Sequence, residues 1–120
     1  MNTASSLPAR DFDTLVQHAR HCSHYVHRLL EADTNLLGWL REHYTQPCTA
    51  AEMTGWLAAM PVADEDELSR ALRALRKRVM LKLLTRDLGG LAGLDEVMST
   101  MTALAELAVQ RAHDFSMQAL

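Results

Sequence analysis

The sequence has little proline, glycine, cysteine or aromatic content. Its 120 residues include three prolines, five glycines and two cysteines, and only 5% are aromatic. Runs of β-branched residues, which are typical of strands, are absent. Leu, Ala, Met and Val must therefore fill the core. These absences predict an all-α protein, and the length predicts one domain with a modest core.

The two cysteines, Cys22 and Cys48, are too few for a disulfide framework, and their spacing does not indicate a zinc site. We therefore expect reduced thiols and a cytoplasmic location. No apolar run reaches the roughly 20 residues that a membrane-spanning helix needs. The N-terminus also lacks the apolar region of a signal peptide. The sequence thus argues against a membrane protein.

The charge balance argues against nucleic-acid binding. The formal net charge is −3 and the pI is about 6.0, whereas nucleic-acid-binding proteins usually show a basic excess or a basic stripe. A basic run from Arg70 to Lys82 does occur, but it follows an acidic run. Much of it falls on a helix face that water can solvate.

The stretch from Asp64 to Gly90 organises the chain and has the signature of one long helix. Asp64 and Glu67 have capping-box spacing and lie where the helix dipole favours negative charge. Gly89 and Gly90 can end the helix, because glycine accepts the left-handed conformation of a C-cap. The pattern predicts a helix over residues 64–88.

The faces of this helix change along its length. One stripe is apolar throughout, at Leu68, Leu72, Leu75, Val79 and Leu83. Beyond Val79 the helix is apolar on its outer side as well, while Arg78, Lys82 and Arg86 rotate toward the stripe. A helix that is apolar all round must be covered on all sides. The cover can come from the other helices of this chain or from a further domain.

Helical patterns also occupy the rest of the chain. Residues 11–31 form one helix or two, with Ser23 as the N-cap of the second. A short helix follows up to Tyr44, and the next begins at a Thr49–Glu52 capping box. A last long helix covers residues 95–117. We expect a flexible N-terminus at residues 1–10 and a single all-α domain at 11–120, a bundle of about five to six helices.

The most prominent candidate ligands are histidines. His18, His21, His24 and His27 recur every three residues, with Cys22 among them and His43 further along. Imidazole and thiolate bind transition metals. However, three residues turn a helix by about 300°, so that His18 and His27 face opposite sides. No HExxH or CxxC pattern is present. We therefore interpret these histidines as surface groups and not as metal ligands.

Other candidate chemistry is equally weak. Cys22 could pair with His18, but nothing in the sequence orients the histidine as a base. Capping explains Asp64 and Glu67. The glycines at 89, 90 and 93 follow a helix rather than a strand, which indicates a turn and not a phosphate-binding loop. From the residues alone we assign no catalytic, cofactor-binding or metal-binding residue.

A combination of motifs nevertheless points to a family. The long helix carries an LR-x-x-R-x-R-x-M pattern from Leu72 to Met80 and ends in Arg86-Asp87-Leu88. The last helix carries an LA-x-x-A run from Leu104 to Ala108. Upstream, an SxYV stretch is followed by an LLxW stretch. Their defined positions are Ser23, Tyr25, Val26, Leu36, Leu37 and Trp39. Residues 23–115 thereby resemble the N-terminal helical region of bacterial glutamine synthetase adenylyltransferases, closest to the beta-proteobacterial members.

The resemblance implies a bifunctional enzyme of nitrogen regulation. Such enzymes transfer AMP from ATP to a tyrosine of glutamine synthetase and remove it by phosphorolysis in a second, related domain. Both reactions need Mg²⁺, and glutamine and the P-II signal proteins regulate them. The implied partners of this chain are glutamine synthetase, P-II proteins and the catalytic domain that follows this region in the family.

The sequence departs from the family at the catalytic motif. The family's first catalytic domain begins with a GxLGGxELxxxSDxD stretch whose aspartates hold metal and phosphates, and this chain contains no such stretch. No catalytic residue can be transferred. We expect a non-catalytic N-terminal fragment, in which Arg86 could pair across the junction with the missing domain. The alternative is a stand-alone helical module that docks on a partner.

Overall fold

The computed structural model of the chain describes residues 11–119, and this range contains six α-helices and no strand. The helices are α2 (Phe12–Cys22), α3 (His24–Ala32), α4 (Asn35–His43), α5 (Ala50–Ala58), α6 (Glu65–Leu88) and α7 (Leu94–Ala119). The predicted all-α fold with two long C-terminal helices is confirmed. The predicted flexible segment, residues 1–10, lies outside the described residues.

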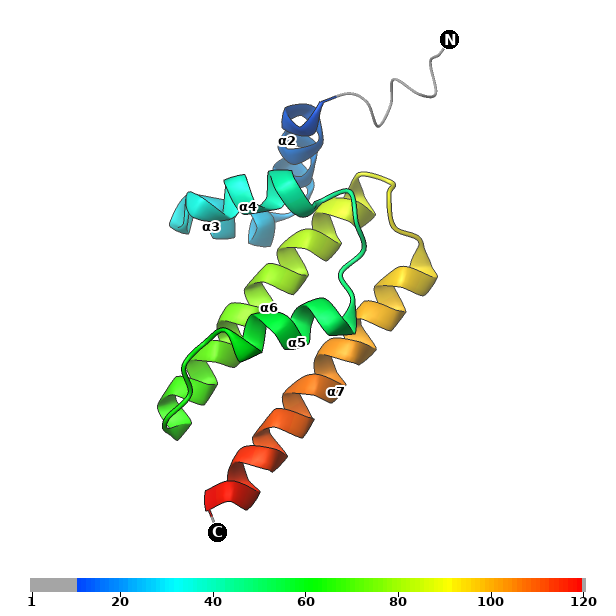
Figure 1. Ribbon diagram of the computed structural model, residues 1–120. Coiled ribbons are helices and arrows are strands. Elements are labelled where there is room, and N and C mark those ends of the chain that lie inside the picture. Colours follow the sequence, from blue (N-terminus) through cyan, green and yellow to red (C-terminus); the bar gives the residue numbers. More distant parts are fainter. Residues whose placement is uncertain (1–10, 120) are drawn as a thin grey trace.

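Helix α6 is the axis of the molecule (Figure 1). Asp64 Oδ1 accepts a hydrogen bond from the Glu67 N–H at 2.8 Å, as the capping pattern predicts. The Glu67 carboxylate reaches back to the Ala63 N–H at 2.7 Å. At the other end Gly90 has φ 78°, and the Arg86 carbonyl accepts from the Leu91 N–H at 2.8 Å. Glycine at this position therefore ends α6.

Two apolar clusters lie along α6, one toward each end. Helices α2, α3 and α4 gather around its C-terminal half, whereas α5 and α7 lie beside its N-terminal half (Figure 1). Leu81 belongs to the first cluster, and Leu75 and Val79 belong to the second. The residues of α6 buried beyond Val79 are Leu81, Lys82, Leu83, Thr85 and Arg86. The predicted need for all-round cover is confirmed, and helices of this chain provide it.

Local capping explains how the shorter helices begin. Ser23 is extended, with φ −131° and ψ 112°, and its hydroxyl accepts from the Val26 N–H at 3.2 Å. Residues 12–32 are therefore two helices, separated at Ser23. Thr49 caps α5 by accepting from the Glu52 N–H at 3.1 Å. Before α4 it is Asp33 that accepts from the Asn35 N–H, at 3.0 Å, whereas Thr34 makes no side-chain cap.

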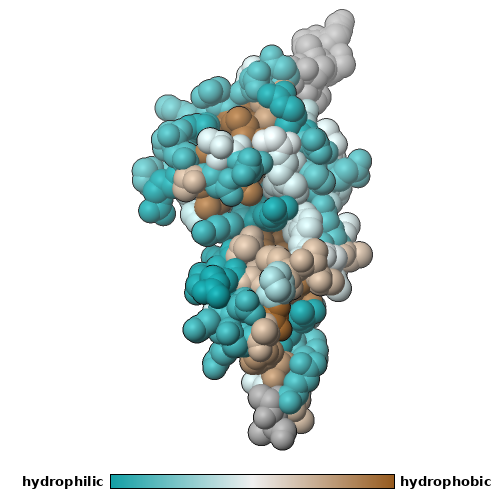
Figure 2. Space-filling model, turned by 60° about the vertical axis from the view of Figure 1, so that its left-hand side comes forward, coloured by the Kyte–Doolittle hydropathy of each residue, from teal (hydrophilic) through white to brown (hydrophobic). Residues whose placement is uncertain are grey.

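Helix α7 packs through one narrow face. Leu104 is buried and Leu107 is partly buried against α5 and α6. The apolar residues that flank this face are instead exposed, most clearly Leu94, Met98 and Val109. In the face shown in Figure 2, apolar side chains lie between hydrophilic ones in the lower half, where α5, α6 and α7 lie. No described helix combines the length and apolarity needed to cross a membrane.

Two glycine-to-alanine substitutions should have opposite effects on stability. Gly90→Ala places a Cβ at φ 78° and should lower the free energy of unfolding by about 1–2 kcal/mol. Gly55→Ala lies inside α5, where the added Cβ meets no side chain or other segment within 4 Å, and should raise the free energy of unfolding by up to about 1 kcal/mol. Urea denaturation of both variants measures this. Equal stabilities would contradict the role of Gly90.

Candidate functional site

The histidines predicted as candidate ligands do not form a cluster. His18, His21 and His24 are exposed on α2 and α3, and Cys22 Sγ lies 3.7 Å from His18 Nε2 at the surface. His43, on α4, donates from Nδ1 to the Trp39 carbonyl at 2.7 Å. Among the described residues, no three His, Cys, Asp or Glu side chains are placed to share a metal ion.

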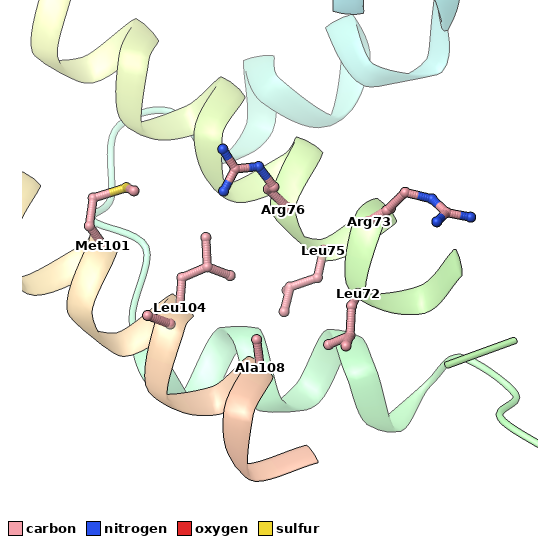
Figure 3. A pocket seen from close by; sticks show the side chains of 8 residues that line it. Leu72, Arg73, Leu75, Arg76, Met101, Leu104 and Ala108 are labelled. Carbon is pink, nitrogen blue, oxygen red and sulfur yellow. The ribbon is translucent and has the colours of Figure 1, made fainter. Parts of the chain in front are cut away.

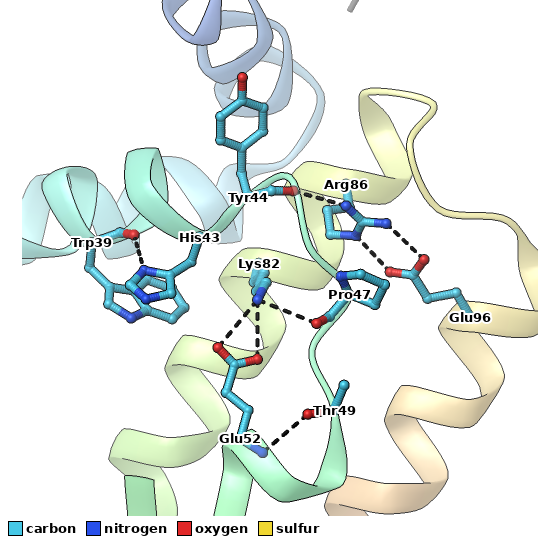
Figure 4. A network of polar contacts seen from close by, with 9 residues as sticks. All are labelled: Trp39, His43, Tyr44, Pro47, Thr49, Glu52, Lys82, Arg86 and Glu96. Atoms are coloured by element: carbon cyan, nitrogen blue, oxygen red, sulfur yellow. Dashed lines mark hydrogen bonds and ion pairs between the residues drawn. The ribbon is translucent and has the colours of Figure 1, made fainter. Parts of the chain in front are cut away.

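The polar groups that the fold does bring together surround two cations of α6 (Figure 4). Lys82 is 1% exposed, and its Nζ lies 3.1 Å from Glu52 Oε1 and 3.5 Å from the Pro47 carbonyl oxygen. A buried ammonium needs both an opposite charge and hydrogen-bond acceptors. The carboxylate that the sequence places in a capping box therefore serves as the counter-ion of Lys82.

Arg86 lies one turn further along α6 and is also buried. Its Nε and Nη2 donate to the two Glu96 carboxylate oxygens at 2.7 and 2.9 Å. Nη1 donates to the Tyr44 carbonyl at 2.9 Å, and Nη2 also donates to the Leu91 carbonyl at 3.2 Å. The hypothesis that Arg86 pairs across a junction with another domain is therefore wrong, because its partners lie in this chain.

These contacts fix the charge states of nearby groups. The hydrogen bonds from Arg86 lower the pKa of Glu96 from its ordinary value of 4.5. Burial, reinforced by the charge of Glu52, raises the pKa of Cys48 to about 12. The Cys48 thiol is therefore protonated at neutral pH and does not act as a nucleophile. The buried polar contacts hold helices together and supply no reactive group.

Arg78 contacts one tryptophan beside each of the two apolar clusters. Its guanidinium lies 5.3 Å from the ring centroid of Trp39 and 5.9 Å from that of Trp56. The two tryptophans meet edge to face at 5.3 Å. A cation over aromatic faces is stabilised by the ring quadrupole. The predicted rotation of Arg78 toward the apolar stripe thus places it between α4 and α5.

A groove with a volume of about 260 Å³ lies between α6 and α7. Its walls are Leu72, Arg73, Leu75 and Arg76 of α6 and Met101, Leu104, Ala105 and Ala108 of α7. The leucine side chains lie between the two helices, and the Arg73 guanidinium points away from α7 (Figure 3). Such an apolar groove with a cationic edge is suited to binding a protein segment.

The family model for glutamate-ammonia ligase adenylyltransferase matches residues 14–120. The chain belongs to this family. The resemblance stated from the sequence is thereby confirmed. No solved structure matches this chain.

Several curated relatives carry the name bifunctional glutamine synthetase adenylyltransferase/adenylyl-removing enzyme. The Nitrosomonas eutropha protein is 47% identical over 95 residues, which cover 78% of this chain and 10% of the relative. The Nitrosomonas europaea protein is 44% identical, with the same coverage. The Chromobacterium violaceum protein is 43% identical over 78% of this chain and 11% of its own length. The chain thus spans about a tenth of the length of the adenylyltransferases it matches.

Neutralising the partner of the buried Lys82 should destabilise the fold. Glu52→Gln leaves an ammonium without a counter-ion and should lower the free energy of unfolding by about 3 kcal/mol. Adding Lys82→Met should recover most of this loss, because the buried charge is then removed as well. The control Asp13→Asn, which breaks an exposed pair with Arg41, should change the free energy by less than about 1 kcal/mol. Chemical denaturation of the four proteins gives these values, and an unaffected Glu52→Gln would exclude the proposed pairing.

The pair between Arg86 and Glu96 should make stability depend on pH. Because folding lowers the pKa of Glu96, its contribution is complete well above the ordinary value of 4.5 and is lost as the pH falls through 4.5 toward the folded pKa. Glu96→Gln should therefore be less stable than the unmodified protein at pH 7. The two melting temperatures should converge in acid. A difference between the two melting temperatures that stays constant across the whole acid range would contradict this linkage.

Proposed function

We propose that this helical unit is the N-terminal segment of an enzyme that transfers AMP from ATP to a tyrosine of glutamine synthetase and removes it by phosphorolysis. The family match over residues 14–120 carries this proposal. We further propose that the unit itself is not catalytic and works in the cytoplasm. Its buried cations are supported by acceptors within the chain, and its buried thiol is protonated at neutral pH. These groups serve packing and leave no reactive centre among the buried residues described.

We assign the Mg²⁺ and ATP of the reaction to other parts of such an enzyme. Magnesium in nucleotidyl transfer is held by carboxylates and substrate phosphates. Among the described residues, the carboxylates of Glu52 and Glu96 are already paired with Lys82 and Arg86, and no three His, Cys, Asp or Glu side chains come together. Contacts with glutamine synthetase and P-II proteins likewise belong to the enzyme as a whole in this proposal.

A second candidate function is a stand-alone helical module that binds a partner. The exposed apolar side chains of α7, Leu94, Met98 and Val109, favour this alternative. A module of this kind would act without any adenylyltransferase. The two functions therefore differ in whether the unit can replace its counterpart inside a relative of the family.

A chimeric enzyme tests the proposed function. In the Nitrosomonas eutropha enzyme, the segment that aligns with this chain is replaced by residues 14–120. Transfer of labelled AMP from ATP to glutamine synthetase should stay within about tenfold of the parent enzyme. The 120-residue protein alone should transfer none. A parent enzyme that lacks the segment serves as the control, and it should lose transfer because apolar surface that the segment covers would be exposed to water.

Two results would overturn the proposal. AMP transfer by the 120-residue protein alone would show that the unit is catalytic. A chimera that is folded but inactive, beside an active parent, would show that the unit is not equivalent to the family segment. The second result would favour the stand-alone module.

A further inference from the structure

Helix α7 presents a second apolar stripe that the fold leaves open. Leu94, Met98 and Val109 are 75%, 60% and 69% exposed. With Ala105 and Ala112, which are also exposed, they follow one side of the helix at a period of about 3.6 residues. A soluble protein rarely leaves a continuous apolar stripe uncovered unless the stripe binds something.

This stripe continues into the groove between α6 and α7. Ala105 belongs to both, and Met101 and Ala108 extend the apolar surface toward α6 (Figure 3). Helix α5 packs against α6 and α7 but contributes no residue to the groove. Three helices are thus in contact, and the groove offers a place for a fourth beside α6 and α7.

The edge of the groove on α6 is positively charged. Arg73 and Arg76 line the groove and are exposed. Neither forms an ion pair with another described residue, unlike Lys82 and Arg86 further along the helix. An occupant with acidic residues along this edge would complement the two charges, and like charges there would be repelled.

We propose that this surface, formed by the α6–α7 groove and the open stripe of α7, is the docking site for an amphipathic helix of the larger adenylyltransferase polypeptide. The helix would place apolar residues spaced by three and four over Ala105 and Val109, and acidic residues beside Arg73 and Arg76. This proposal rests on the proposed function. It identifies which face of the unit meets the rest of the enzyme.

Two observations favour this occupant over a separate protein or a second copy. About nine-tenths of the length of the relatives has no counterpart in this chain, so that most of such an enzyme is available to cover the surface. A segment of the same polypeptide also binds at a high effective concentration, and a single groove then suffices. A separate partner would need a larger interface for stable binding.

Thiol labelling measures whether the groove is covered. Ala105→Cys places a thiol in the groove, and Gln110→Cys places one on an exposed part of α7 about 140° around the helix. Both are made with Cys22→Ser, which removes the exposed native thiol. The labelling rates are measured by peptide mass spectrometry, in the 120-residue protein and in the chimera described above.

In the 120-residue protein both introduced thiols should label rapidly. In the chimera, labelling at position 105 should slow at least about tenfold, which corresponds to closure of the site for most of the time. Labelling at position 110 should not change. Equal labelling at position 105 in both proteins would overturn the proposal. Slow labelling in the 120-residue protein, together with a dimeric mass, would identify a second copy as the occupant and would also overturn it.

Charge reversal tests the acidic edge of the occupant. Arg73→Glu and Arg76→Glu should each speed labelling at position 105 of the chimera several-fold. Arg70→Glu makes the same charge change at an exposed position of α6 outside the groove, and should have no effect. The melting temperature of each variant in the 120-residue protein shows that the helices are intact. Unchanged protection in both groove variants would exclude an acidic edge.

The same chimera separates this proposal from the proposed function. If the chimera transfers AMP while the thiol at position 105 still labels rapidly, only the proposed docking surface is wrong. If that thiol is protected but a folded chimera transfers no AMP, only the proposed function is wrong.

Discussion

The buried positions of Lys82 and Arg86 are the constraint on which the arrangement of helices depends. Apolar packing alone tolerates small shifts between helices, because it has no direction. A buried cation tolerates no such shift, because each of its N–H groups needs an acceptor at a fixed place. Lys82 takes its acceptors from Pro47 and Glu52, and Arg86 takes both carboxylate oxygens of Glu96 at the start of α7. One turn of α6 therefore positions both α5 and α7.

How many of these contacts could be predicted from the sequence depends on how far apart the interacting residues lie along the chain. The caps at Ser23, Thr49 and Asp64 are local, since donor and acceptor lie three residues apart, and all three were predictable. The partner of Lys82 was not, because Glu52 is thirty residues away. Its capping-box spacing also suggested a different role. The pattern of α7 showed which residues are apolar but not which of its sides α5 and α6 would cover.

The titratable groups of this unit and its apolar groove have different roles. Some titratable groups form ion pairs with the buried cations, as Glu96 does with Arg86, and others are exposed at the surface, as His18 is. What α6 and α7 present outward is an apolar groove edged by Arg73 and Arg76, which form no ion pair with any other residue that the structure describes. The match covers only about a tenth of the length of the named relatives, and such a division suits a unit that supports neighbouring parts of an enzyme.

Helix α6 also sets how the two ends of the molecule can move. It runs for 24 residues with no glycine or proline inside it, a length of about 36 Å. Kinks in helices arise mostly at such residues, so that α6 behaves as a stiff rod. Its groove-lining turns and the turns beneath α2 and α3 belong to this one rod. A rotation of α6 imposed at the groove would therefore be transmitted as torque to the histidine-bearing helices at its far end, instead of being absorbed by a hinge.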